Sequence, residues 1–348
     1  MSKVHAEPVN LGSNGLVSKL KANPFLLACI FNFAALLVCF CCFRIRYEAS
    51  DDYMIDAILS GAFGYGYSPY LLWGNPILGN ILVAFYKLIP DISFYFVLLI
   101  LLGFLSSTSI TYLLFKKGIN AVSVCIALIY LCVFSEDIYV LLQFTKISAI
   151  AGIAGGLLIV HGIWEEKNRK IRFIVLGTLL SLLGSMVRFS TVYIYGAFLL
   201  VTFLYYSVIH IKDNAKSDTN KKTAFSSACL IQIGKRLLIC IVIVAFLFGC
   251  EYLGNYIRVS DQKLKDFNDF QSLRYGITDT IRPEYETAKE DFDNLGLDYI
   301  DYCMLSLWQF VDKDVYSNET LSDVGVLLKN YSSNQTHNLS YVFYVLTR

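Results

Sequence analysis

Charged residues are scarce in this chain of 348 residues. Asp, Glu, Lys and Arg together make up 16% of it, whereas an average soluble domain carries about 25%. Hydrophobic residues account for 56%, and the mean hydropathy is +0.54. This balance is typical of a protein that crosses a lipid bilayer several times, and it argues against a soluble globular fold.

Several chemical signatures are also missing. The sequence has no phosphate-binding Walker loop, no Cys/His spacing that suits a metal, and no Ser/His/Asp nucleophile pattern. Gly61, Gly64 and Gly66 follow no predicted strand, so their spacing is not a dinucleotide fingerprint. The net charge of +1 and the scattered basic residues argue against a nucleic-acid partner. No internal repeat of the kind found in many transporters is present.

The ten cysteines do not form a disulfide pattern. All except Cys303 lie in or beside apolar runs, where cysteine behaves as a small buried hydrophobe. Neither a disulfide framework nor a zinc site is therefore expected. The first 22 residues contain no apolar run followed by a cleavage site, so the first hydrophobic segment is expected to be a retained helix.

Seven apolar segments are candidates for membrane spans, because a helix needs about 20 apolar residues to cross a hydrocarbon layer of about 30 Å. They cover residues 24–43, 93–115, 119–134, 147–163, 171–187, 190–211 and 237–253. The predicted fold is therefore an all-α, polytopic transmembrane helix bundle of about seven spans over residues 24–253. Outer juxtamembrane helices are expected in its first outer loop, residues 44–92.

The basic residues between the segments predict the orientation. Three basic loops lie at residues 116–117, 167–172 and 212–236. All three face the cytoplasm if seven segments cross and residues 1–23 are a cytoplasmic N-terminal segment. Arg44 and Arg46 oppose this rule but are outnumbered. The sequence thus predicts a multi-pass protein of a bacterial plasma membrane, with residues 254–348 outside.

Two regions need separate treatment. Residues 71–89 are apolar but are interrupted by two glycines, two asparagines and a proline. As a full span they would place the three basic loops outside, so we interpret them as a juxtamembrane or re-entrant helix. Residues 254–348 are acidic and polar, and apolar residues over 299–308 recur at helical spacing. A small helical extracytoplasmic region is expected there.

The acidic pair Asp51–Asp52 follows the first apolar segment. The pattern after it predicts a helix in the plane of the membrane interface, with Ser50 as N-cap and with Asp52 and Asp56 away from the apolar face. Acids in a first turn stabilise the helix dipole and need no other role. Because this pair also lies at the mouth of the predicted bundle, beside the glycine-rich residues 61–66, we take it as the catalytic candidate.

A second acidic pair, Glu136–Asp137, lies in the loop between the third and fourth segments, on the same predicted face. Carboxylates from two loops could hold a divalent cation, Mg²⁺ or Mn²⁺, through oxygen ligands. One of them could instead deprotonate a hydroxyl group, and a solvated loop is the plain alternative. Arg188 and Lys146 are predicted near the outer interface, where they either bind a lipid phosphate or extend toward head groups.

This layout resembles the superfamily C membrane glycosyltransferases, which take sugars from polyprenyl-phosphate donors. Members carry an acidic residue or pair in the first outer loop, the place of Asp51–Asp52, and many carry a second acidic motif in a later outer loop, the place of Glu136–Asp137. Residues 68–90 are similar to the Pro/Tyr-containing juxtamembrane segment of such enzymes. The shared core has seven spans. The resemblance covers residues 20–255, and the C-terminal region matches no soluble domain that we can name.

The resemblance implies sugar transfer by direct displacement at the anomeric carbon. Asp51 or Asp52 would activate the acceptor, and Arg188 and Lys146 would neutralise the leaving phosphate. The implied substrate cavity includes Asp56, Tyr65 and Tyr70. The implied partners are a polyprenyl-phosphate sugar donor, a glycan, lipid or protein acceptor, and the bilayer. The alternative is a non-catalytic transporter or flippase, or an accessory protein, for lipid-linked saccharides.

Overall fold

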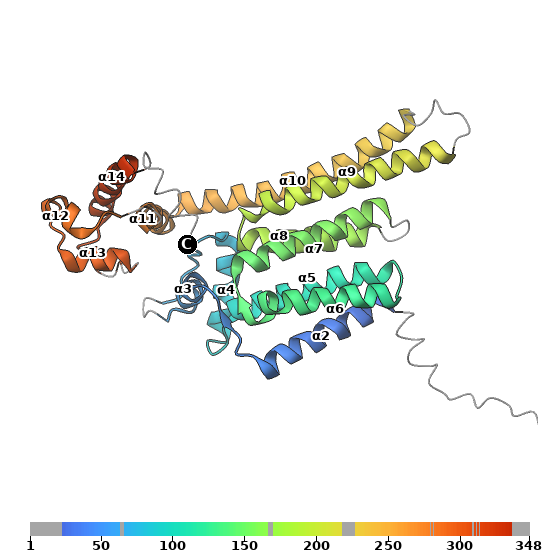
Figure 1. Cartoon of the computed structure of the whole chain (residues 1–348), viewed down its shortest axis with the longest axis horizontal. Coiled ribbons are helices and arrows are strands. Elements are labelled where there is room, and N and C mark those ends of the chain that lie inside the picture. Colours follow the sequence, from blue (N-terminus) through green and yellow to red (C-terminus); the bar gives the residue numbers. More distant parts are fainter. Residues whose placement is uncertain are drawn as a thin grey trace, which may run out of the picture. The chain divides into compact units, whose positions relative to one another are not determined.

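The computed structural model forms two compact units, Met1–Tyr256 and Ile257–Arg348. It describes residues 23–62, 66–165, 170–217, 227–278, 280, 282–307, 310, 312 and 314–335. The described chain is almost entirely helical, and the first unit is a bundle of long helices (Figure 1).

The first unit contains nine described α-helices, the last of which, α10, continues for four residues into the second unit. They are α2 (Pro24–Cys42), α3 (Ser50–Ser60), α4 (Pro76–Leu88), α5 (Phe94–Lys116), α6 (Ala121–Ser135), α7 (Phe144–Trp164), α8 (Lys170–Val187), α9 (Thr191–Ser217) and α10 (Ser227–Ser260) among the described residues. A π-helix, η1 (Glu136–Val140), extends α6. Two short strands, β1 (Arg46–Tyr47) and β2 (Leu141–Leu142), pair in parallel.

Six helices of the described chain are long and apolar enough to cross a membrane. They are α2, α5, α6 with η1, α7, α9 and α10. Helix α8 has 18 residues, which rise about 27 Å, and it packs along α7. The predicted polytopic helical membrane bundle is therefore confirmed, with α8 as a shorter seventh segment.

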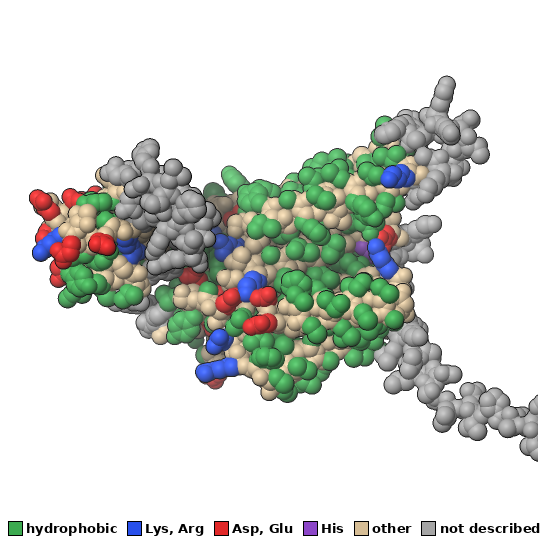
Figure 2. All heavy atoms as spheres, viewed as in Figure 1, with side chains coloured by type: hydrophobic (Ala, Val, Ile, Leu, Met, Phe, Trp, Pro, Cys, Tyr) green, Lys and Arg blue, Asp and Glu red, His purple; other side chains and the backbone are tan. Residues whose placement is uncertain are grey.

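The uneven burial of the helices shows which of them face lipid. Helix α7 is the central one, since 67% of its apolar window is buried, against 11% to 22% for α2, α6, α9 and α10. The outer helices expose large apolar side chains along their length, and Figure 2 shows these side chains covering the visible face of the bundle. A bilayer supplies the apolar surroundings that such a surface needs.

The two ends of the bundle differ in character. Helices α2, α6 and α8 end where α5, α7 and α9 begin, and α3 and α4 lie at this same end (Figure 1). In the chain order β1 follows α2, and η1 and β2 lie between α6 and α7, so these elements belong to the same end. We call it the loop end. The opposite end carries Lys116, Lys117 and Arg236, and we call it the basic end.

Helix α4 resolves the ambiguous segment 71–89. Its 13 residues rise about 20 Å, which is too short to cross a hydrocarbon layer of about 30 Å. The side chain of Asn75 caps it by accepting a hydrogen bond from the backbone N–H of Ile77 at 3.0 Å, and Pro76 occupies the first turn. The expected juxtamembrane helix is thus present at the loop end.

Glycines allow α7 and α8 to approach closely. A Cβ atom added at Gly155 would lie 2.4 Å from the carbonyl oxygen of Gly177 and 2.3 Å from Ser181 Oγ. A Cβ at Gly152 would lie 2.1 Å from the ring of Tyr195 on α9. Small residues at such seams are how membrane helices gain van der Waals contact without a hydrophobic driving force.

Replacement of Gly155 by leucine is expected to destabilise the bundle, because α7 and α8 must then separate. Overpacking of this kind costs about 1–3 kcal/mol and occasionally more. Gly249→Leu is the matched control, since nothing lies within 4 Å of an added Cβ there. In detergent, the unfolding temperature should fall by at least about 4 °C for the first variant only. Equal unfolding temperatures for the two variants would show that this seam is not tightly packed.

The second unit is a small helical domain with its own core. Its helices are α11 (Gln262–Thr278), α12 (Tyr285–Asn294), α13 (Tyr299–Ser306) and α14 (Asn318–Gln335). Phe292, Leu305 and Leu321 are buried together between them. The side chain of Asp298 caps α13 in a reciprocal pair with Asp301. The helical C-terminal region predicted from the sequence is confirmed.

Candidate functional site at the loop end

The two predicted acidic loops meet at the loop end of the bundle. Strand β1 follows α2 and strand β2 follows η1, and they pair with Arg46 opposite Leu141 and Tyr47 opposite Leu142. The N–H of Glu48 extends the pairing by donating to the carbonyl oxygen of Leu142 at 2.9 Å. This backbone pairing fixes the loop after α2 against the loop after α6.

Lys146 links the same two loops, because its ammonium group forms an ion pair with one carboxylate from each of them. Its Nζ lies 2.6 Å from Oε2 of Glu48 and 2.5 Å from Oδ1 of Asp137. One ammonium group therefore serves two carboxylates, one from each loop. Lys146 was predicted to bind a donor phosphate, but in the structure its charge is matched by the carboxylates of Glu48 and Asp137.

Asp52 is completely buried although it is ionisable. Its Oδ1 accepts hydrogen bonds from the hydroxyl of Tyr95 at 2.9 Å and from the backbone N–H of Phe144 at 3.0 Å. Its Oδ2 has no hydrogen-bond partner within the described part of the chain. Burial raises the pKa of Asp52 to about 7, with a smaller upward push from Asp51 and Glu48 and an opposing pull from the two hydrogen bonds.

Asp56 is held on every side by hydroxyl groups. It accepts hydrogen bonds from Tyr47 at 2.9 Å, from Ser93 at 2.8 Å and from Tyr86. Burial raises the pKa of both tyrosines above the ordinary value of 10.0, so they stay protonated donors. Asp56 was predicted to line a substrate cavity, but its carboxylate is occupied in fastening α3 to α4, α5 and β1.

Helix α3 is therefore oriented differently from the prediction. Asp52 and Asp56 were expected on a polar face, but both point into the protein, where hydroxyl donors of other elements compensate their burial. The side chain of Tyr53 lies on the exposed face of α3 instead, with 61% of its surface exposed. The helix begins at Ser50, and Ala49 rather than Ser50 is the N-cap. Asp51, in the first turn, stays half-buried and thus partly open to solvent.

Arg188 lies in the turn between α8 and α9. Its Nη1 donates to Thr145 Oγ1 at 2.5 Å and its Nε donates to Ser190 Oγ at 3.0 Å. The guanidinium carbon lies 5.2 Å from the ring centre of Trp73 and 5.0 Å from that of Phe144. Among the described residues, no carboxylate lies within 4.0 Å of it. A held cation without an acidic partner suits an anionic ligand.

The first turn of α7 connects Asp52, Arg188 and the two carboxylates that Lys146 binds. The N–H of Phe144 binds Asp52, its ring contacts Arg188, and the next two residues hold Arg188 and the two loop carboxylates. The positive end of the helix dipole lies at the same place. Sequence reasoning missed Phe144, Thr145 and Trp73, because no motif relates them to Arg188.

A groove of about 610 Å³ reaches the loop end between α2 and α6. It is apolar along most of its length, and Ser135 and Glu136 lie at its loop end. Glu136 belongs to η1, and π-helical turns occur frequently at functional sites. The groove thus combines an apolar channel with an acidic end.

The remaining predicted residues are less informative. Tyr70 is partly buried in the segment before α4, and Tyr65 lies outside the described residues. No group of three or more His, Cys, Asp or Glu side chains in the described chain is close enough to hold a metal ion. Asp137 is bound to Lys146, and Glu136 lines the α2–α6 groove. The divalent cation predicted between the two acidic pairs stays a prediction.

Comparison with known proteins returned nothing for this chain. No family model, curated protein or solved structure matches it. What the loop end does must therefore be inferred from its own chemistry.

Proposed function

We propose that the protein is a membrane glycosyltransferase that moves a sugar from a polyprenyl-phosphate donor to a glycan, lipid or protein acceptor. The observation that carries this proposal is the first turn of α7. It contacts Asp52 from the first loop on one side and Arg188 on the other. Sugar transfer needs a base for the acceptor hydroxyl and a cation for the leaving phosphate. Asp51, the neighbour of Asp52 in the chain, and Arg188 are the groups that we assign to these two tasks.

The two neighbouring aspartates are given different roles. Asp51 is half-buried and is the base, because a general base must reach a substrate hydroxyl. Asp52 is fully buried and is a positioning residue: through Phe144 it holds the first turn of α7, which in turn holds Arg188. A pKa of about 7 leaves Asp52 largely neutral in slightly acidic medium.

In the proposed reaction the acceptor oxygen attacks the anomeric carbon of the donor sugar, and its proton passes to Asp51. The bond between the anomeric carbon and the phosphate oxygen breaks, and its electron pair leaves with the polyprenyl phosphate. Arg188 stabilises the negative charge that develops on this phosphate. The α2–α6 groove offers an apolar path beside the loop end for a lipid-linked substrate.

The test is sugar transfer by the full chain in lipid vesicles, with a radiolabelled sugar on polyprenyl phosphate. Arg188→Gln should raise the donor KM about tenfold or more, since a hydrogen bond to a charged group contributes about 1.5–3 kcal/mol. Lys116→Gln, at the basic end, is the matched control and should leave the KM unchanged.

Two results would oppose the proposal. An unchanged kcat/KM for Arg188→Gln would remove Arg188 from the reaction. Movement of the intact labelled donor across the bilayer, without release of polyprenyl phosphate, would favour the flippase alternative.

A further inference from the structure

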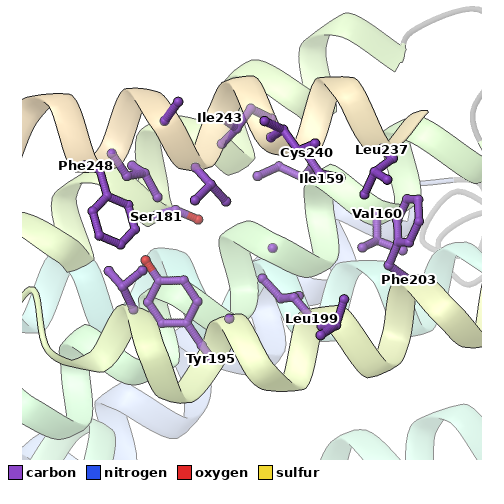
Figure 3. Close-up of a pocket in the computed structure, with 18 residues that line it drawn as sticks. Ile159, Val160, Ser181, Tyr195, Leu199, Phe203, Leu237, Cys240, Ile243 and Phe248 are labelled. Carbon is purple, nitrogen blue, oxygen red and sulfur yellow. The ribbon is translucent and has the colours of Figure 1, made fainter. Parts of the chain in front are cut away.

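A separate groove lies between α9 and α10, over α7 and α8 (Figure 3). Its volume is about 420 Å³, and almost every side chain that lines it is apolar. The lining includes Ile159, Leu199, Phe203, Leu237, Ile243 and Phe248. The groove takes no part in the loop-end site.

A cation lies at the basic end of this groove. The guanidinium carbon of Arg236 is 4.1 Å from the ring centre of Trp164, whose ring is 5.5 Å from that of Phe203 in the groove lining. Nη1 of Arg236 is buried and has no hydrogen-bond partner among the residues that the structure describes. Within the same residues, no carboxylate lies within 4.0 Å of Arg236.

The nearby acid is already engaged. Glu165, at the end of α7, binds Lys117 at 3.3 Å, the hydroxyl of Tyr206 at 2.5 Å and Nδ1 of His161 at 2.9 Å. These contacts satisfy its carboxylate. Among the described residues, therefore, no carboxylate neutralises the guanidinium of Arg236, and an anionic group from elsewhere can bind it.

The length of the groove sets the size of its occupant. On α10 the lining runs from Leu237 to Phe248, and at about 1.5 Å per residue this span is about 17 Å. Half of a hydrocarbon core of about 30 Å is about 15 Å. At the far end, Phe248 meets Phe189 edge to face, with ring centres 4.9 Å apart. The occupant is therefore apolar over one leaflet and charged at the basic end.

We propose that the groove binds an anionic phospholipid of the leaflet at the basic end, with an acyl chain along α9 and α10 and the phosphate on Arg236. A phosphate oxygen would accept the hydrogen bonds that Arg236 can donate, and Trp164 would lie at head-group level. Basic pockets between membrane helices are known to bind anionic lipid head groups. This proposal does not depend on sugar transfer at the loop end.

The role of the Arg236 charge in lipid binding is tested by reconstituting the full chain in vesicles of phosphatidylcholine and phosphatidylglycerol at nine to one. Native mass spectrometry then counts the lipids that stay bound. The wild type should retain phosphatidylglycerol above its share of the mixture, and Arg236→Gln should reduce this enrichment about tenfold. Lys235→Gln removes the same charge from the exposed neighbouring residue and should retain the enrichment.

The groove itself is tested by filling it. Gly196 lines the groove and nothing lies within 4 Å of an added Cβ, so Gly196→Phe places a ring in the channel. Bound phosphatidylglycerol should be lost. Gly249→Phe, also in open space but outside the lining, should keep it. Retention of phosphatidylglycerol by the wild type only in proportion to its share of the mixture, unchanged enrichment in Arg236→Gln, or a dimer mass in place of bound lipid would overturn the proposal.

Discussion

The Asp52→Asn variant is expected to lose a large part of the pH dependence of stability that the wild-type protein shows. Burial raises the pKa of Asp52 from 3.8 to about 7. A group whose pKa is raised in the folded state contributes stability fully below its unfolded pKa, and this contribution is lost as the pH rises through the folded pKa. The wild type should therefore lose stability between pH 3.8 and about 7.

The expected size follows from the shift. A difference of about three pKa units corresponds to roughly 4 kcal/mol. Asparagine has the shape of the neutral acid, and its oxygen can accept the same hydrogen bonds from Tyr95 and Phe144. The variant should thus match the wild type at acidic pH and exceed it at pH 8.

The measurement is the unfolding temperature in detergent at a series of pH values, compared between variants. The difference between the variant and the wild type isolates Asp52 from other carboxyl groups that titrate in this range. Asp51→Asn is the matched control, and it should keep most of the wild-type slope because it leaves the buried carboxyl group of Asp52 in place. Identical slopes for Asp52→Asn and the wild type would show that Asp52 is not buried as described.

The sequence was sufficient to predict the helical bundle, because long apolar runs and helix-start residues are local signals. Asn23–Pro24 and Asn75–Pro76 begin α2 and α4 with a capping side chain and a proline in the first turn. The glycine, asparagine and proline interruptions of residues 71–89, together with the positions of the basic loops, also separated this segment from the spans. Local patterns of this kind need no knowledge of the remaining chain.

The candidate site could be predicted only in part. The helical pattern placed Asp52 and Asp56 away from the apolar face of their helix. In the structure, the hydroxyl of Tyr95, 43 residues beyond Asp52, and that of Tyr86, 30 residues beyond Asp56, make their burial tolerable. The pairing of β1 with β2 involves two residues on each strand, which is too short for any sequence pattern. Such long-range contacts decide the site and leave no local trace.

Asp51→Asn is expected to reduce sugar transfer about 10²–10⁴-fold, the usual contribution of a general base. Asparagine keeps the size of the side chain but cannot take the proton of the acceptor. Asp52→Asn should retain much more activity, because the amide can keep the hydrogen bond that holds Phe144. The same substitution at these two adjacent positions therefore compares a base with a positioning residue.

The initial rate of sugar transfer by these two variants, in vesicles that contain equal amounts of inserted protein, tests the proposed division of roles most directly. We predict at least a 100-fold loss for Asp51→Asn, as expected for a general base, and a much smaller loss for Asp52→Asn. A wild-type rate for Asp51→Asn would contradict the assignment of Asp51 as the base.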